Sequence, residues 1–152
     1  MTSTDQTVSV LNDLIQTSED GKQGFQAAAE KAADPSLKNL FQSRSQSCAA
    51  AVNELQQIVR SLGVDPKDSG TVSGAIHRGW VKVKAAVGDN NLAVLEEVER
   101  GEDVAKEAYM QALRADLPTT IKDVVSKQYE GVLQNHNRVR DLRNQYRSSA
   151  SH

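Results

Sequence analysis

Glu102 is the residue of this chain whose type and position most strongly suggest a functional or structural centre. Between Asn91 and Leu113, apolar residues recur every three or four positions, which is typical of the buried face of a helix. The members of this stripe are Leu95, Val98, Ala105, Tyr109 and Ala112. Glu102 falls on the same stripe. A carboxylate on a buried face is costly unless another group pairs with it, so we expect a partner elsewhere in the chain.

The other reactive side chains form no recognisable catalytic set. The histidines are His77, His136 and His152, and the single cysteine is Cys48. One cysteine excludes an intramolecular disulfide and a multi-cysteine metal site. The sequence also contains no glycine-rich phosphate loop, no Ser/His/Asp signature and no zinc-ligand spacing. These observations favour a non-enzymatic protein that carries no cofactor.

The segment from His77 to Trp80 is the most distinctive short motif of the chain. His77 and Trp80 are neighbours on a short amphipathic helix that the apolar spacing predicts over residues 72–87. We expect Trp80 to be largely buried and to anchor this helix to the rest of the molecule. His77 and Arg78 are candidates for contact with a ligand or a protein partner.

Four long amphipathic segments must position these residues. They cover residues 3–33, 35–62, 91–115 and the stretch that follows Pro118. Asp34 and Pro35 have the types expected at the start of a helix, and Gly63 the type expected just after one. Short connections make each pair of segments an antiparallel hairpin. We therefore predict an all-α four-helix bundle of two hairpins, joined by a long crossover that contains the short helix. It forms one domain over residues 1–147, followed by a flexible tail over 148–152.

This topology resembles the ferritin-like four-helix bundle. The segments that carry a more specific resemblance are LNDLIQTSEDGKQGF, DPSLKNLFQSRSQSC, SGAIHRGW, ERGED and NHNRVRDLR. They are similar to an uncharacterised bacterial family, a ferritin-like domain of unknown function, over residues from about 7 to 143. The resemblance implies the fold and brings no established activity.

The sequence disfavours the di-iron chemistry that this topology can support. That chemistry requires a Glu from each of two helices and a Glu-x-x-His motif from each of the other two. No Glu-x-x-His occurs here, because Leu133 stands three residues before His136 and Gly74 three before His77. A di-iron protein remains the alternative, and it would need unconventional carboxylate ligands. The candidates are Glu19, Asp20, Glu99, Glu102 and Asp103.

A buried polar layer is the favoured interpretation of Glu102. Counting turns along the bundle places Arg44 within about one helical turn of Glu102, close to 5.4 Å. We predict a layer formed by Arg44, Glu102, Gln128, Ser18 and His136, in which Arg44 is buried and hydrogen-bonded to Glu102 or Glu99. Such a layer fixes the register of the helices, or is the remnant of a metal centre in which an ion pair has replaced the ions.

Composition sets the remaining limits on function. The formal net charge of −2 gives no general attraction to nucleic acid or to an anionic membrane. No apolar run approaches the ~20 residues that a membrane span needs, and the first residues do not resemble a signal peptide, so we expect a cytoplasmic protein. The leading hypothesis is a non-enzymatic bundle that acts by self-association or through a protein partner, including a role under stress.

Overall fold

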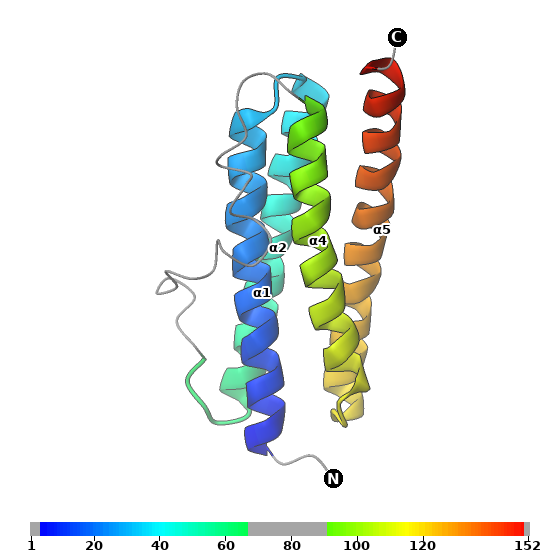
Figure 1. The fold of residues 1–152 in the computed structure, drawn as a ribbon. Helices are drawn as coiled ribbons and strands as arrows, with labels where there is room; N and C mark the ends of the chain where they lie inside the picture. The colour runs from blue at the N-terminus through cyan, green and yellow to red at the C-terminus, as the bar shows by residue number, and fades with distance from the viewer. Residues whose placement is uncertain (1–3, 67–90, 151–152) are drawn as a thin grey trace.

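Four helices make up the part of the chain that the computed structural model describes, residues 4–66 and 91–150 (Figure 1). They are α1 (Thr4–Lys31), α2 (Pro35–Ser61), α4 (Asn91–Arg114) and α5 (Thr119–Ala150). Two antiparallel hairpins, α1–α2 and α4–α5, lie side by side, with α1 packed against α4. α2 and α4 run in the same direction, opposite to α1 and α5. The predicted all-α four-helix bundle is confirmed.

The turn between α1 and α2 follows from Asp34 and Pro35. Asp34 has an extended backbone (φ −74°, ψ 123°), and its Oδ1 accepts the backbone N–H of Ser36 at 2.9 Å. Pro35 follows in the first turn of α2, where an N–H is not required. At the other end of α2, Gly63 adopts φ 81°, and its N–H and that of the next residue bond to carbonyl groups of the last turn. Both predicted helix ends are confirmed.

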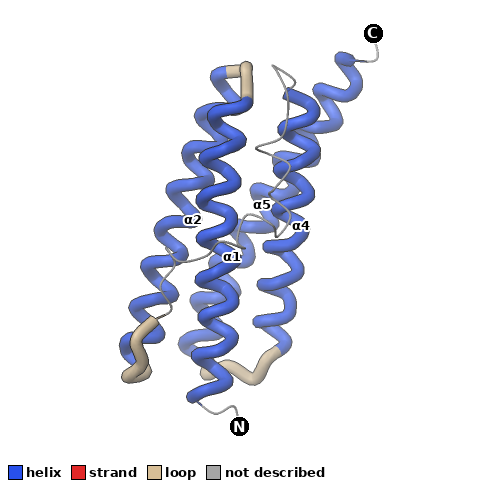
Figure 2. The backbone as a smooth tube through the Cα atoms, turned by 60° about the vertical axis from the view of Figure 1, so that its left-hand side comes forward, coloured by secondary structure: helices blue, strands red, loops and turns tan. Residues whose placement is uncertain are grey.

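The C-terminal end of α5 is longer than predicted. The sequence suggests a flexible tail from Ser148, whereas the helix continues to Ala150. Each added residue of an existing helix gains a backbone hydrogen bond, so weak helix formers can extend it. This end diverges from the neighbouring helices in both views (Figures 1 and 2). No helix in the described part of the chain is long and apolar enough to cross a membrane.

The helix predicted over residues 72–87 lies outside the described residues. The expectations for His77, Arg78 and Trp80, including the burial of Trp80, therefore remain predictions.

The buried side chains form two apolar clusters instead of one continuous core. One cluster contains Phe25, Phe41 and Val98, and it occupies the half of the bundle nearest the α1–α2 turn. The other contains Leu14 and Val125, and it occupies the opposite half. Between the clusters, the helices present polar and small residues to one another. The polar and ionisable side chains that could form a functional site therefore lie at the middle level of the bundle.

Candidate ligand pocket at the centre of the bundle

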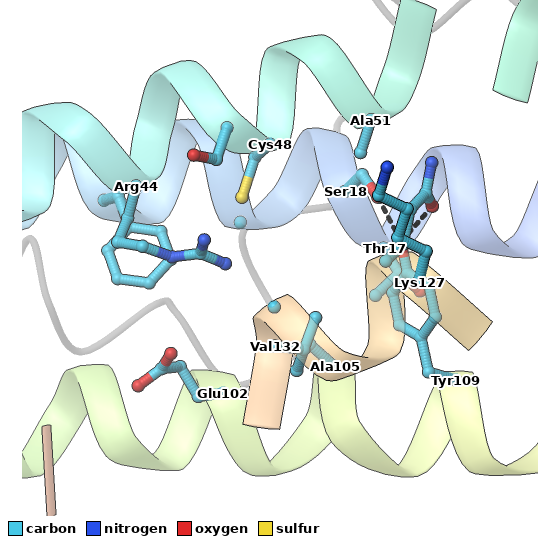
Figure 3. A pocket seen from close by; sticks show the side chains of 15 residues that line it. Thr17, Ser18, Arg44, Cys48, Ala51, Glu102, Ala105, Tyr109, Lys127 and Val132 are labelled. Carbon is cyan, nitrogen blue, oxygen red and sulfur yellow. Dashed lines mark hydrogen bonds between the residues drawn. The ribbon is translucent and has the colours of Figure 1, made fainter. Parts of the chain in front are cut away.

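A pocket of about 260 Å³ lies between the two apolar clusters (Figure 3). All four described helices contribute to its lining. Its polar and charged members include Ser18, Arg44, Glu102, Tyr109, Lys127 and Gln128. Four of the five residues that the sequence predicts for a buried polar layer thus surround one pocket, and His136 is the exception.

Two glycines shape this pocket in opposite ways. A Cβ atom on Gly21 would lie 3.1 Å from Sγ of Cys48, so the glycine permits α1 and α2 to approach closely. A Cβ atom on Gly131 would meet no other atom within 4 Å, so the lack of a side chain on α5 leaves open space there. Close packing of the α1–α2 hairpin and an open wall on α5 together produce the pocket.

Glu102 is the buried acid of the pocket, with 3 % of its surface exposed. Its Oε2 accepts a hydrogen bond from Nδ2 of Asn135 on α5, whereas its Oε1 is buried without a hydrogen-bond partner. Burial raises the pKa of the Glu102 carboxyl to about 7, because the charged form loses its hydration. The hydrogen bond from Asn135 and the charge of Arg44 oppose this rise without cancelling it. Near neutral pH the carboxyl therefore exchanges between its protonated and ionised forms.

The predicted hydrogen bond between Arg44 and a carboxylate of α4 is not present. Among the described residues Arg44 forms no hydrogen bond and no ion pair, and it is half-buried instead of fully buried. Its guanidinium lies over the ring of Phe25, 5.9 Å from the centroid, and extends into the pocket on the side facing Glu102 (Figure 3). Asn135 takes the place beside Glu102 that the sequence assigned to Arg44, and Glu99 is paired with Arg143.

A chain of hydrogen bonds crosses the bundle beside the pocket. The Tyr109 hydroxyl donates to Oε1 of Gln128 at 2.8 Å, and it lies 3.2 Å from the hydroxyl of Ser18. Nε2 of Gln128 donates to Glu54 at 2.7 Å, which links the chain to α2. Burial raises the pKa of Tyr109 to about 12 and that of the Cys48 thiol to about 11. Both groups are therefore uncharged at neutral pH, and Cys48 is not an activated nucleophile.

His136 does not belong to the central layer. Its Nε2 lies 2.6 Å from Oδ1 of Asp103, whose side chain is 62 % exposed, so the pair sits at the edge of the α4–α5 contact. Asn135, which is buried, occupies the inward position that was predicted for His136. The sequence spacing does indicate an inward position for Asn135, because it stands three residues after Val132 and four before Val139, on the apolar stripe of α5.

The central residues do not fit a di-metal centre. Glu102 is the one carboxylate in the described lining of the pocket, and the guanidinium of Arg44 faces it. The five carboxylates proposed as metal ligands have separate partners: Gln23 for Glu19, Gln16 for Asp20, Arg143 for Glu99, Asn135 for Glu102 and His136 for Asp103. Within the described ranges, no three His, Cys, Asp or Glu side chains are grouped so that they could hold a metal ion.

Similarity to solved structures defines the class of the fold. The chain resembles a two-domain protein with DJ-1/ThiJ/PfpI-like and ferritin-like domains from Anabaena variabilis, with a TM-score of 0.76 and 17 % identity. The match covers 97 % of this chain and 41 % of that one, so this chain spans about two fifths of its length. It also resembles a point mutant of Dps1 from Mycobacterium smegmatis, with a TM-score of 0.71 and 14 % identity over 93 % and 98 % of the two chains. The molecule is a ferritin-like four-helix bundle.

Sequence comparison identifies the family. Residues 6–115 match the model of the family described as a domain of unknown function, DUF2383, and the chain belongs to this family. A comparison with curated proteins finds no significant match. The predicted membership of an uncharacterised ferritin-like family is therefore confirmed, and the function must be argued from the pocket itself.

Proposed function

We propose that this protein acts by binding a small molecule in the central pocket, without catalysing a reaction. The observation that carries the proposal is a pair of buried polar atoms without hydrogen-bond partners at one pocket, Nε of Arg44 and Oε1 of Glu102. Leaving such atoms unpaired costs about 1–3 kcal/mol each, more when they are charged. A ligand that satisfies both atoms would recover this free energy.

The size and lining of the pocket support a small ligand. Binding sites for drug-sized molecules usually measure about 300–1,000 Å³, and this pocket is smaller, at about 260 Å³. Apolar side chains such as Phe25 and Val132 line it together with a few polar groups. That combination is typical of sites in which apolar contact supplies affinity and a few polar groups fix orientation.

Filling the pocket tests the proposal. Because a side chain at position 131 would enter open space, Gly131→Leu should occupy part of the pocket without displacing the surrounding helices. We expect calorimetric titration to detect binding of at least one of benzoate, benzamide and benzamidine to the wild-type protein. The Gly131→Leu variant should remain folded and lose this binding. A wild-type protein that binds none of the three compounds would contradict the proposal.

The self-association, protein partner and stress-related role expected from the sequence remain predictions. Val104 is the one large apolar side chain that stands out as exposed on the described surface, at 39 %. Size-exclusion chromatography with light scattering tests self-association directly, and a strictly monomeric chain would contradict it.

A further inference from the structure

The guanidinium of Arg44 is a charged group that lacks an acceptor within the pocket. Its Nε is buried, and the part of the chain that the structure describes provides it with the face of Phe25 and no oxygen acceptor. A guanidinium can donate up to five hydrogen bonds and matches the geometry of a carboxylate in a two-point interaction. Arg44 therefore offers the pocket an anchor for an anion.

Glu102 provides the second anchor from the opposite helix. Its Oε2 is held by Asn135, which leaves Oε1 as the free oxygen of a side chain that is only 3 % exposed. The carboxyl and the guanidinium line the same pocket from α4 and α2 without forming an ion pair (Figure 3). The space between them can accept a polar group that contacts both.

The charges of the pocket lining determine whether a positively or a negatively charged ligand group is favoured. Arg44 and Lys127 are cationic, whereas Cys48 and Tyr109 are uncharged at neutral pH, since burial raises the pKa of the thiol to about 11 and that of the phenol to about 12. Glu102 is the remaining ionisable group of the described lining, and it is partly protonated near pH 7. The pocket therefore carries an excess of positive charge that favours an anion.

We infer that the pocket binds a small organic carboxylate, whose carboxylate group lies between Arg44 and Glu102 and whose apolar part lies against Phe25, Ala105 and Val132. This inference rests on the proposed function and specifies its ligand class. The ligand carboxylate accepts hydrogen bonds from Arg44 and one from the protonated Oε1 of Glu102. A bare inorganic anion would leave the apolar lining unused, and a cation would meet Arg44.

Binding of such an anion is coupled to proton uptake from solvent wherever Glu102 is ionised in the free protein, so the average uptake is about half a proton at pH 7 and approaches one at higher pH. Two ionised carboxylates cannot share a hydrogen bond, so an ionised Glu102 must be protonated before it can donate to the ligand. Other charged groups near Glu102 keep their own partners. On its own helix Glu99 is paired with Arg143 and Asp103 with His136, and across the bundle Glu19 bonds to Gln23 and Glu54 to Gln128. Arg44 and Lys127 are the cations that line the described part of the pocket.

Calorimetric titration with benzoate tests the inference, with benzamide and benzamidine as neutral and cationic compounds of similar shape. For a group with a pKa of about 7 in the free protein, benzoate binding should weaken about tenfold between about pH 6 and pH 8. Glu102→Gln should bind benzoate without this pH dependence, because the amide donates a hydrogen bond and does not titrate. Buffers of different ionisation enthalpy should report the uptake of a proton by the wild-type protein above about pH 7.

Substitutions of two arginines test whether benzoate binding depends on Arg44 itself or only on the net charge of the protein. Arg44→Met should weaken benzoate binding about 10- to 100-fold, which is the range for loss of a hydrogen bond to a charged group. Arg140→Gln removes the same charge from an exposed site on α5 and should leave binding unchanged. Arg44→Lys keeps the charge, loses the planar fork and should give an intermediate affinity. Circular dichroism of each variant shows whether the fold is retained.

The possible outcomes distinguish this inference from the proposed function. If benzamide or benzamidine binds and benzoate does not, the pocket is a binding site and the anion inference is wrong. Equal effects of Arg44→Met and Arg140→Gln on benzoate binding would also overturn it. If no compound binds to the wild-type protein, both the pocket and its ligand class are contradicted.

Discussion

At the scale of single residues, Glu102 makes the stability of the bundle depend on pH. Its carboxyl is buried between the helices and retains one hydrogen bond, from Asn135. An unfolded chain exposes the same carboxyl to water, where its pKa is about 4.5, against about 7 in the fold. Ionisation therefore favours the unfolded state over the interval between these two values.

We expect the free energy of unfolding attributable to Glu102 to fall as the pH rises from 4.5 to about 7. Below this range the group is protonated in both states, and above it the group is ionised in both. Within the range the unfolded chain binds fewer protons than the folded one, so stability declines with pH. A pKa difference of about 2.5 corresponds to about 3 kcal/mol. Urea unfolding at a series of pH values measures this decline.

Two variants isolate the contribution of Glu102. Glu102→Gln should flatten the decline and be more stable than the wild type at about pH 8, because a neutral amide replaces a buried charge. Glu107→Gln changes an exposed carboxylate on the same helix and should keep the wild-type dependence. If both variants follow the wild-type curve, Glu102 is not the titrating group.

Double-mutant cycles should show that Glu102 is coupled more strongly to Asn135 than to Arg44. Glu102 accepts a hydrogen bond from Asn135, whereas Arg44 acts on it through charge alone. We expect a coupling energy of about 1–3 kcal/mol for Glu102→Leu with Asn135→Leu. A smaller coupling is expected for Glu102→Leu with Arg44→Met. The two cycles are measured by urea unfolding, and a larger value for the Arg44 cycle would support the ion pair first predicted from sequence.

These residues also show how far side-chain partners can be predicted from sequence. The position of Glu102 on an apolar stripe correctly indicates a buried carboxyl, because helical period and burial are linked. Its partner depends on the rotation of α5 about its axis, and a change of one residue there exchanges Asn135 for His136. Sequence period alone does not determine that rotation to within one residue.

At the scale of the helices, Gly21 and Gly131 should respond differently to alanine. Each is a mid-helix glycine, for which alanine is favoured by about 1 kcal/mol in helix propensity. Gly131→Ala meets no atom within 4 Å, so we expect it to raise the free energy of unfolding by about this amount. Gly21→Ala places a Cβ atom 3.1 Å from Sγ of Cys48, and we expect that contact to remove most or all of the gain.

A Cys48→Ala background tests the assigned cause. Without Sγ the contact disappears, so Gly21→Ala should become stabilising in that background, while Gly131→Ala should gain the same amount in both. Thermal unfolding of the single and double variants gives these differences. If Gly21→Ala behaves identically in the two backgrounds, the close approach to Cys48 is not the constraint.

The helix ends were the most predictable elements, because their signals are local. Asp34 and Pro35 at the start of α2, and Gly63 after its end, act through backbone geometry within a few residues. The C-terminal end of α5 has no such stop signal, and the predicted boundary fell short of Ala150 there. The pocket was harder to foresee, because open space beside Gly131 depends on the distance between helices, which sequence period does not specify.

At the scale of the whole molecule, one end of the bundle is tied together by polar side chains. Oδ1 of Asn91, the first residue of α4, accepts the backbone N–H groups of Ala33 and Asp34 at 2.9 and 3.2 Å. The carboxylate of Asp34 also accepts a hydrogen bond from the hydroxyl of Tyr146 on α5. The α1–α2 turn is thereby joined to both helices of the second hairpin, through pairs far apart in sequence that no local pattern identifies.

Removing the Tyr146 hydroxyl should loosen α5 from this end of the bundle. The hydrogen bond from Tyr146 is the largest cause of the lowered pKa of Asp34, so in Tyr146→Phe that pKa should return toward 3.8 in an NMR titration of the carboxyl. The hydrogen bond from Tyr146 to the ionised carboxylate of Asp34 lies at a partly exposed end of the bundle, where water can replace it, so its loss should have little effect on the free energy of global unfolding. The larger effect should be local, as faster amide hydrogen exchange after Val139, because the end of α5 diverges from its neighbours in Figures 1 and 2.

Asn91→Ala serves as the comparison, since it releases α4 from the same turn and should leave exchange in α5 unchanged. Equal acceleration of α5 in both variants would mean that the turn and α5 open as one unit, and that Tyr146 has no separate role in holding the fourth helix.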